Sequence, residues 1–241
     1  MIADICVSMR AEDWLQLPEL VIHDVPVALE GAGLKAYRAM EKTMVAEVNG
    51  EEISATTAAA LTGKLLQLCG GAVYDENGEA HHVHDAKLEA LEDIIDSCVE
   101  ENKKVVVFAR FVPEIDSIAK MLRKKNIGYA LIKGDVSDRA EQVEAFQTDP
   151  DVKVFIGQLQ TTGMGLTLTA GTVAVYYSLD FSYANYEQSR ARIRRIGQTK
   201  RGVYIHLVCK NTIDEKVMAT LKQKADVSKL LVDDYKQLIG G

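Results

Sequence analysis

The 241-residue sequence has few cysteines, no long apolar run and no stretch with the pattern of a secretory signal. Its four cysteines, Cys6, Cys69, Cys98 and Cys209, lie far apart and form no CxxC pair, so they are expected to be reduced and mostly buried. The longest apolar runs are only a few residues, which excludes a transmembrane helix. The N-terminus carries acidic residues early and lacks the apolar core of a secretory signal. These absences predict a cytoplasmic protein.

The composition is that of a globular protein, with 47% hydrophobic and 26% charged residues. A net charge of −7 by itself argues against a nucleic-acid-binding protein. The charge is unevenly distributed, however. Residues 1–102 hold 6 Lys/Arg and 20 Asp/Glu, whereas residues 103–241 hold 22 and 15. This asymmetry indicates an anionic partner for the basic part, although the acids could simply solvate the helices of the first part.

Residues 1–85 are predicted to form a mostly helical segment. Apolar residues alternate over 25–29 as in a short strand, and Pro26 marks an edge strand or a strand end. Two helices are expected within this segment: one begins near Gly31, and the other is capped by Ser54. A third helix is expected directly after it, capped by Asp85. Between the last two, the polar stretch 74–84 contains an Asn-Gly pair and is predicted to be a turn or an exposed loop.

From residue 103, strands and helices alternate. Five runs rich in β-branched residues are predicted to be strands: 105–109, 129–132, 153–157, 173–179 and 203–208. Helices are expected after Pro113, over 138–147, over 183–195, and after a capping box formed by Thr212 and Glu215. This alternation predicts an α/β fold with a parallel sheet that helices cover on both faces.

Ligands of an open parallel sheet bind beyond the carboxyl ends of its strands, and three loops leave such ends here. They begin at Arg110-Phe111, at residue 158 and at residue 180. The second loop reads QLQTTGMGLTLTAG. Gly163 and Gly165 let its backbone approach a ligand closely, and its threonine hydroxyls can donate to phosphate oxygens. A tight turn would explain these two glycines equally well.

The third loop leads into the stretch QSRARIRRIGQ, residues 188–198. Gln188, Arg192 and Arg195 are spaced by four and three residues, so they share one face of a helix. Guanidinium groups suit phosphate oxygens, and two on one face can neutralise charge on a transferring γ-phosphoryl group. The alternative is a solvated basic helix or a nonspecific nucleic-acid patch.

Taken together, these stretches resemble the C-terminal RecA-like lobe of superfamily 2 helicases, and SNF2-type translocases in particular. The arginine stretch is similar to the family's sixth motif, Q-A-x-D-R-x-x-R-x-G-Q. Residues similar to the fifth motif are Gly163, Gly165, Leu166, Leu168, Thr169 and Ala170. Residues 105–111 resemble the fourth motif, and Gly134 with Arg139 resembles a short motif after it.

The resemblance implies three parts of the chain. These are an inter-lobe, mostly helical segment (1–85), a C-terminal RecA-like helicase lobe (86–225) and a C-terminal helical tail (226–241). Residues 17–20, LPEL, and Tyr37 are similar to the family's stretch between the two lobes.

The resemblance also implies a role for individual residues. Arg192 and Arg195 would be arginine fingers on the γ-phosphate, oriented by Gln188, while Gly163 and Gly165 would lie beside the nucleotide. The residues expected to face the DNA backbone are Arg110, Gly134, Gln160 and Thr161. The cofactors would be ATP and Mg²⁺, bound mainly by an N-terminal RecA-like lobe. Duplex or forked DNA is the expected partner. The protein would act in the cytoplasm, on a nucleoid or in a nucleus, and not at a membrane.

The sequence lacks the primary ATP site of such a motor. Gly63-Lys64 is followed by Leu65 and position 58 is alanine, so this stretch is not a P-loop. The chain is therefore expected to be the C-terminal portion of a larger protein and to hydrolyse no ATP alone.

Some residues depart from the family pattern. Ala191 replaces an acid and Arg194 a histidine, Gln158-Leu159 replaces Ser-Thr, and Asp180-Phe181-Ser182 replaces Trp-Asn-Pro. The changes at 191 and 158 bear on coupling efficiency rather than on the fold. Two other functions stay open: a non-catalytic nucleic-acid-binding module, and a lobe of an RNA helicase, although the Gly-Gln ending favours DNA. The histidines at 81, 82 and 84 lack partnered cysteines and indicate an exposed loop rather than a zinc site.

Overall fold

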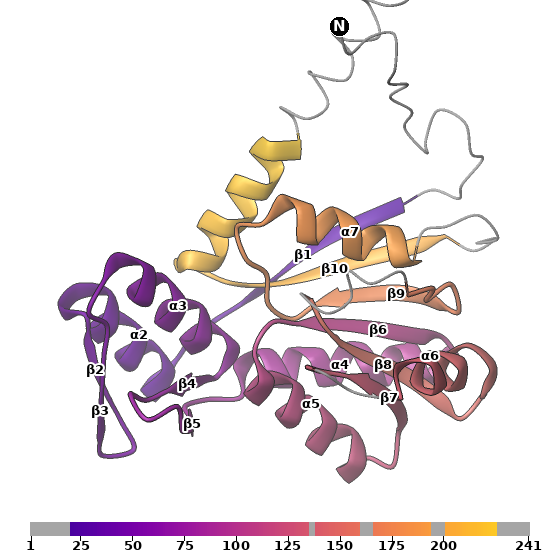
Figure 1. Cartoon of the computed structure of the whole chain (residues 1–241), viewed down its shortest axis with the longest axis horizontal. Helices are drawn as coiled ribbons and strands as arrows, with labels where there is room; N and C mark the ends of the chain where they lie inside the picture. The colour runs from indigo at the N-terminus through magenta and orange to yellow at the C-terminus, as the bar shows by residue number, and fades with distance from the viewer. Residues whose placement is uncertain (1–19, 135–137, 160–165, 194–200, 226–241) are drawn as a thin grey trace, which may run out of the picture.

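The computed structural model describes residues 20–134, 138–159, 166–193 and 201–225. Its centre is a six-stranded sheet in which every strand pairs in parallel with its neighbours, in the order β1-β10-β9-β6-β8-β7 (Figure 1). The strands are β1 (Leu20–Val27), β6 (Lys104–Ala109), β7 (Gly128–Ile132), β8 (Val152–Gln158), β9 (Gly171–Tyr176) and β10 (Gly202–Cys209). This is the predicted RecA-like parallel sheet.

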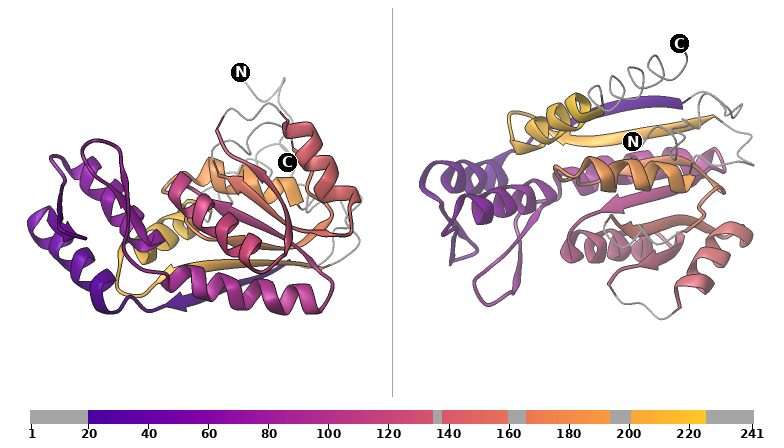
Figure 2. Two further views of the ribbon diagram at one scale, coloured as in Figure 1. Left: turned by 90° about the horizontal axis from the view of Figure 1, so that it is seen from below. Right: turned by 45° about the horizontal axis from the view of Figure 1, so that its top comes forward.

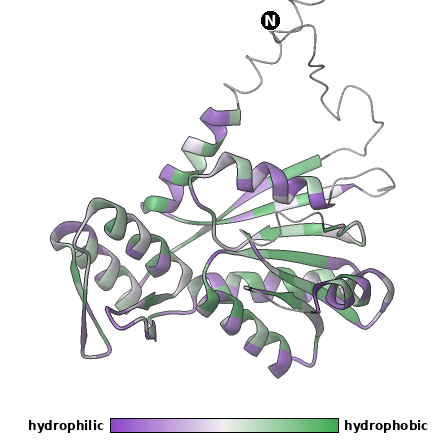
Figure 3. Cartoon of the chain, viewed as in Figure 1, coloured by the Kyte–Doolittle hydropathy of each residue, from purple (hydrophilic) through white to green (hydrophobic). Residues whose placement is uncertain are grey.

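The central strands are buried because helices cover both faces of the sheet. Val105 to Ala109 of β6 are completely buried, and so is the middle of the neighbouring strand β8. The covering helices are α4 (Ala86–Glu100), α5 (Val112–Lys124), α6 (Arg139–Thr148) and α7 (Tyr183–Ile193). Helices α4 and α5 pack on each other under one face, and α6 and α7 cover the other. Figure 3 shows the resulting pattern, with hydrophobic strands between helices that are hydrophilic on their outer sides.

The five strands predicted from residue 103 onward agree with the observed ones to within about two residues, except that β9 ends at Tyr176 rather than at 179. The strand predicted over 25–29 is β1, which begins earlier, at Leu20, and ends at Val27. Helix α5 begins beside Pro113 as expected. A last helix covers residues 213–225, directly after Thr212. At the start of this helix the Cys209 amide donates a hydrogen bond to the carboxylate of Asp214. The predicted capping box assigns such a role to Glu215.

The first segment contains two helices and two hairpins. Helices α2 (Gly31–Thr43) and α3 (Ala58–Gly70) pack against each other beside the sheet rather than on a face of it (Figure 2). One hairpin joins β2 (Val45–Val48) to β3 (Glu51–Ser54), and the other joins β4 (Ala72–Tyr74) to β5 (Ala80–His82). The predicted loop 74–84 is therefore partly a hairpin. The predicted cap of α3, Ser54, is wrong, because Thr57 caps the helix by accepting from the Ala60 amide.

Strand β1 joins this first segment to the sheet. It is an edge strand, as Pro26 predicts, and its whole length pairs with β10, from Leu20 opposite Gly202 to Val27 opposite Cys209. The division of the chain at residue 85 stays a prediction, and residues 226–241 lie outside the described part. Within the described part, no helix is long and apolar enough to cross a membrane.

Candidate functional site

The arginine helix, α7, is anchored through one buried face. Tyr186, Ser189 and Ile193 lie on this face, at spacings of three and four residues. The Ser189 hydroxyl lies 3.0 Å from the hydroxyl of Tyr176 on β9. The helix begins after a turn in which Asp180 Oδ1 accepts from the Ser182 amide at 2.8 Å. These contacts set the position of α7 above β9.

The other face of α7 carries two of the predicted nucleotide-binding residues. Gln188 is exposed and Arg192 is half-buried, one turn further along the helix. The Arg192 carbonyl accepts a hydrogen bond from the amide of buried Leu168 at 2.9 Å. The structure therefore brings together the arginine stretch and the segment that resembles the fifth motif. The other predicted residues of this group, Arg195, Gly163 and Gly165, lie outside the described part of the chain.

Arg190 differs from its neighbours in the arginine stretch. Its guanidinium lies 5.5 Å from the ring centre of Tyr186 and 5.8 Å from that of Tyr204, and it pairs with Glu187. The backbone carbonyl of Arg190 accepts from the Tyr204 hydroxyl at 3.0 Å. This arginine therefore packs α7 onto β10, and it is not directed at a ligand.

Arg110 and Gly134, both predicted to face DNA, are joined by Gln158. The Gln158 side-chain amide donates to the Arg110 carbonyl at 3.1 Å, and its oxygen accepts from the Gly134 amide at 3.2 Å. Gly134 has φ +55°, a conformation that favours glycine. In the sequence Gln158 is a departure from the family pattern, and in the structure it links the ends of three strands, β6, β7 and β8. Gln160 and Thr161 lie outside the described residues.

The guanidinium of Arg110 lies at the carboxyl edge of the sheet. It stacks over the Phe111 ring at 5.1 Å, and its Nη1 is 3.8 Å from Oδ2 of Asp180, in the turn that leads into α7. The side chain is 25% exposed. Arg110 therefore sits between the end of β6 and the start of the arginine helix, where it can reach an anion at this edge.

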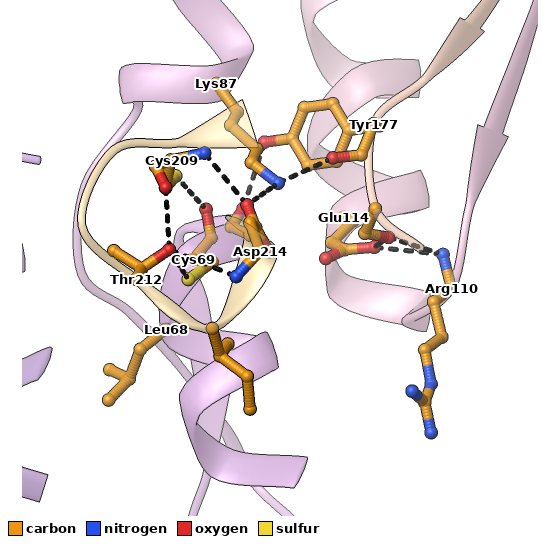
Figure 4. Close-up of polar contacts among 12 residues, drawn as sticks. Leu68, Cys69, Lys87, Arg110, Glu114, Tyr177, Cys209, Thr212 and Asp214 are labelled. Atoms are coloured by element: carbon orange, nitrogen blue, oxygen red, sulfur yellow. Dashed lines mark hydrogen bonds and ion pairs between the residues drawn. The ribbon is translucent and has the colours of Figure 1, made fainter. Parts of the chain in front are cut away.

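Figure 4 shows a buried ionic cluster, on the other side of Glu114 from Arg110, that the sequence did not indicate. The Lys87 ammonium lies 2.7 Å from Asp214 Oδ2 and donates to the Tyr177 carbonyl at 2.9 Å. Burial lowers the pKa of Lys87, but the Asp214 carboxylate together with Cys209 and Cys69 raises it above its usual value. The Tyr177 hydroxyl donates to the Gly70 carbonyl at 2.9 Å. The cluster thus joins α3, α4, the end of β9 and the start of the last helix.

Among the described residues, two groups of side chains have the composition of metal ligands. Cys69, Cys209 and Asp214 place ligand atoms within 4.8 Å of one another, but Asp214 already pairs with Lys87, and burial raises the pKa of the Cys69 thiol. Asp75, Glu79 and His81 form the second group, at the exposed β4–β5 turn, where Asp75 Oδ1 accepts from two amides of its own turn.

The three histidines of the 74–84 stretch do not converge. His81 contacts Asp75 at 3.0 Å and His82 contacts Asp85 at 2.9 Å. His84 lies 2.7 Å from the Leu68 carbonyl. Because each imidazole has a different partner, the three do not form a common site.

Comparisons with known proteins agree with this geometry. Residues 86–197 match the family described as the helicase conserved C-terminal domain. The chain is 29% identical over 246 residues to a putative protein p41 of Acyrthosiphon pisum secondary endosymbiont phage 1, covering 98% of this chain and 50% of that protein. It is 28% identical over 223 residues to an uncharacterized ATP-dependent helicase of Mycoplasma pneumoniae, covering 91% of this chain and 21% of that protein.

More distant relatives include the mouse chromatin-remodeling ATPase INO80, 27% identical over 148 residues that cover 61% of this chain and 10% of that protein. Among solved structures, the C-terminal part of the Fun30 ATPase domain superposes with a TM-score of 0.66 and 18% identity, over 85% of this chain and 89% of that one. The chain thus spans half, or much less than half, of the curated relatives that it matches.

Proposed function

We propose that this chain is the second motor lobe of an SNF2-type, ATP-dependent DNA translocase, a proposal supported by the match of residues 86–197 to the helicase conserved C-terminal domain and by the similarity to an ATP-dependent helicase. In this role it supplies arginine fingers to ATP that an N-terminal lobe binds, and it contacts the DNA backbone. The observation that carries the proposal is the hydrogen bond between the Leu168 amide and the Arg192 carbonyl. It holds the arginine helix against the segment that resembles the fifth motif, at the edge of the sheet where ligands bind.

The residues of this chain fit only part of an ATP site. Arg192, with Arg195, would neutralise charge on the transferring phosphoryl group, and Gln188 would orient them. ATP supplies the phosphoryl group and Mg²⁺ shields its charge when both are bound. The sequence has no G-x-x-x-x-G-K-[ST] stretch to cradle the phosphates. The other half of the site would come from a partner lobe, and lobe closure on ATP would drive movement along DNA.

Contact with DNA would occur through phosphates. Arg110 and Gly134 lie at neighbouring strand ends, joined by Gln158, and Gln160 and Thr161 would extend this surface. Backbone contacts carry no sequence information, and their affinity falls steeply with salt. We therefore infer sequence-independent binding.

The test uses a protein that joins this chain to a lobe with a P-loop. Arg192→Ala should lower DNA-stimulated ATP turnover by about 10³-fold or more, as for other arginine fingers, and leave DNA binding nearly unchanged. Arg123→Ala removes the same charge from exposed α5 and serves as the control. An equal loss of DNA binding and turnover in Arg192→Ala would instead indicate a simple phosphate-binding helix.

Two further measurements separate the alternatives. The 241-residue chain alone should hydrolyse no ATP, and robust DNA-stimulated turnover by it would contradict the proposal. Stimulation of the two-lobe protein by duplex, forked and single-stranded DNA and by RNA identifies the substrate. Stimulation by RNA only would favour the RNA-helicase alternative.

A further inference from the structure

The carboxyl group of Glu114 organises the turn that carries Arg110. Glu114 lies in the first turn of α5 and is 2% exposed. Its Oε2 accepts from the amides of Arg110 and Phe111 at 3.1 and 3.0 Å, and from the Ser178 hydroxyl at 2.6 Å. Ser178 in turn accepts from the Arg110 amide at 2.8 Å. One carboxylate oxygen therefore ties the end of β6 to the chain that follows β9.

This arrangement determines how Arg110 can meet a phosphate. Free amides at the N-terminus of a helix that follows a strand are a ready anion site. In this chain the amides of Arg110 and Phe111 already donate to Glu114. A nucleic-acid phosphate therefore cannot take these two amides. The Arg110 guanidinium, which points away from Glu114 in Figure 4, can reach it instead.

The position of Glu114 is also closed on its other side. Its Oε1 packs against Gly70 at the end of α3, where an added Cβ would lie only 2.0 Å away. This oxygen is buried without a hydrogen-bond partner among the described residues. A buried carboxyl with one unsatisfied oxygen costs free energy, so its contribution is to the geometry of the turn rather than to stability.

We propose that Glu114 is a positioning residue for the nucleic-acid contact. It occupies the amides of Arg110 and Phe111, just before α5, so that Arg110 binds phosphate through its guanidinium and not through its own amide. Through Ser178, Glu114 also couples this turn to the chain leading into α7. The inference rests on the proposed function, because it assumes that Arg110 contacts nucleic acid.

A double-mutant cycle on the two-lobe protein tests the proposal, with duplex DNA binding measured over a range of salt concentrations. Arg110→Ala should weaken binding several-fold and reduce the salt slope by about one phosphate contact. Glu114→Ala should produce the same change, and the double variant should lose no more than Arg110→Ala alone. Glu114→Gln keeps an oxygen acceptor for the two amides and should bind within about twofold of the unaltered protein.

A second measurement is independent of binding. Hydrogen exchange at the Phe111 amide, which donates to Glu114, should accelerate about tenfold in Glu114→Ala and stay near its original rate in Glu114→Gln. The Arg110 amide keeps the Ser178 hydroxyl as an acceptor and should change less. Additive losses in the cycle, or unchanged exchange in Glu114→Ala, would overturn the positioning role. If Arg110→Ala binds DNA normally while exchange accelerates in Glu114→Ala, the DNA contact of the proposed function fails but the organising role of Glu114 within the turn stands.

Discussion

The ammonium nitrogen of Lys87 lies 2.7 Å from Oδ2 of Asp214, and the two side chains are only 1% and 8% exposed. Lys87 comes from α4, and Asp214 lies in the first turn of the last helix. A buried ion pair adds little net stability over apolar residues of the same size, but the loss of one partner leaves an uncompensated charge in the interior.

We therefore expect Lys87→Met to lower the free energy of unfolding by about 3–5 kcal/mol. Adding Asp214→Asn to this variant should restore part of the loss, because the asparagine carbonyl can still accept from the Cys209 amide. Urea unfolding measures both. Lys103→Met, which removes an exposed lysine paired with Glu101, is the matched control and should change little. Equal effects of the two lysine variants would contradict the importance of the buried pair.

His206 should make the protein sensitive to acid. Its Nδ1 lies 2.8 Å from Asp24 Oδ1, its Nε2 lies 3.0 Å from the Tyr186 hydroxyl, and it is 1% exposed. Burial lowers the pKa of His206 below its usual 6.5 and outweighs the nearby Asp24 carboxylate. The unfolded chain therefore binds a proton more readily than the folded chain, so the free energy of unfolding should fall as the pH falls below about 6.5.

The variant His206→Gln removes this contribution, so its stability should depend less on pH between about 6.5 and 5. His84, whose pKa burial also lowers, should leave a residual slope. Urea unfolding at several pH values tests this expectation. The control is His23→Gln, which changes an exposed histidine on the neighbouring edge strand β1. A pH dependence in His206→Gln identical to that of the unaltered chain would show that His206 does not carry the effect.

Two glycines, Gly71 and Gly78, both have positive φ, but only at Gly71 would an added Cβ meet a close neighbour. Substituting each by alanine therefore separates the cost of backbone strain from the cost of a steric clash. Gly71 ends α3 with φ +99°, and an added Cβ would lie 2.4 Å from the His84 carbonyl oxygen. Gly78 has φ +84°, with nothing within 4 Å of its added Cβ. Gly78→Ala should cost about 1–2 kcal/mol for its backbone conformation alone. Gly71→Ala should cost about 1–3 kcal/mol more, because the backbone must also move. Thermal unfolding of the two variants should rank them in this order.

Gln158 should matter for nucleic-acid binding without contacting nucleic acid. Leucine in its place removes both hydrogen bonds that tie Arg110 and Gly134 together. Gln158→Leu should weaken DNA binding several-fold and leave the stability of the buried sheet largely intact. Fluorescence anisotropy with labelled duplex DNA measures the effect. Lys120→Ala removes a positive charge from the exposed side of α5 and is expected to bind normally; a larger loss in this control would place the DNA surface elsewhere.

The fold could be predicted largely from the sequence because its strands are short runs of buried β-branched residues separated by helices. The hairpin β2–β3 was missed, although Asn49-Gly50 at its turn is a strong hairpin signal. Its strands are only four residues each, and they carry glutamates that hide the alternation.

The candidate site could be predicted only where a local motif marks it. The spacing of Gln188 and Arg192 is visible along one helix, whereas the contacts of the buried cluster join distant parts of the chain. Lys87 and Tyr177 are 90 residues apart, and Glu114 and Ser178 are 64 apart. No periodicity over a few turns can show such pairs, so the sequence indicates neither the cluster around Lys87 and Asp214 nor the contacts of Glu114.

Strand β1 has one further consequence, for the order in which the chain can fold. Its only partner in the described sheet is β10, and the bond between Asp24 and His206 spans 182 residues. During synthesis β1 therefore stays without its strand partner until β10, near the end of the lobe, has left the ribosome. Closing so long a loop is slow, so the pairing of β1 with β10 should be a late step, after the locally connected strands β6, β7 and β8 have assembled.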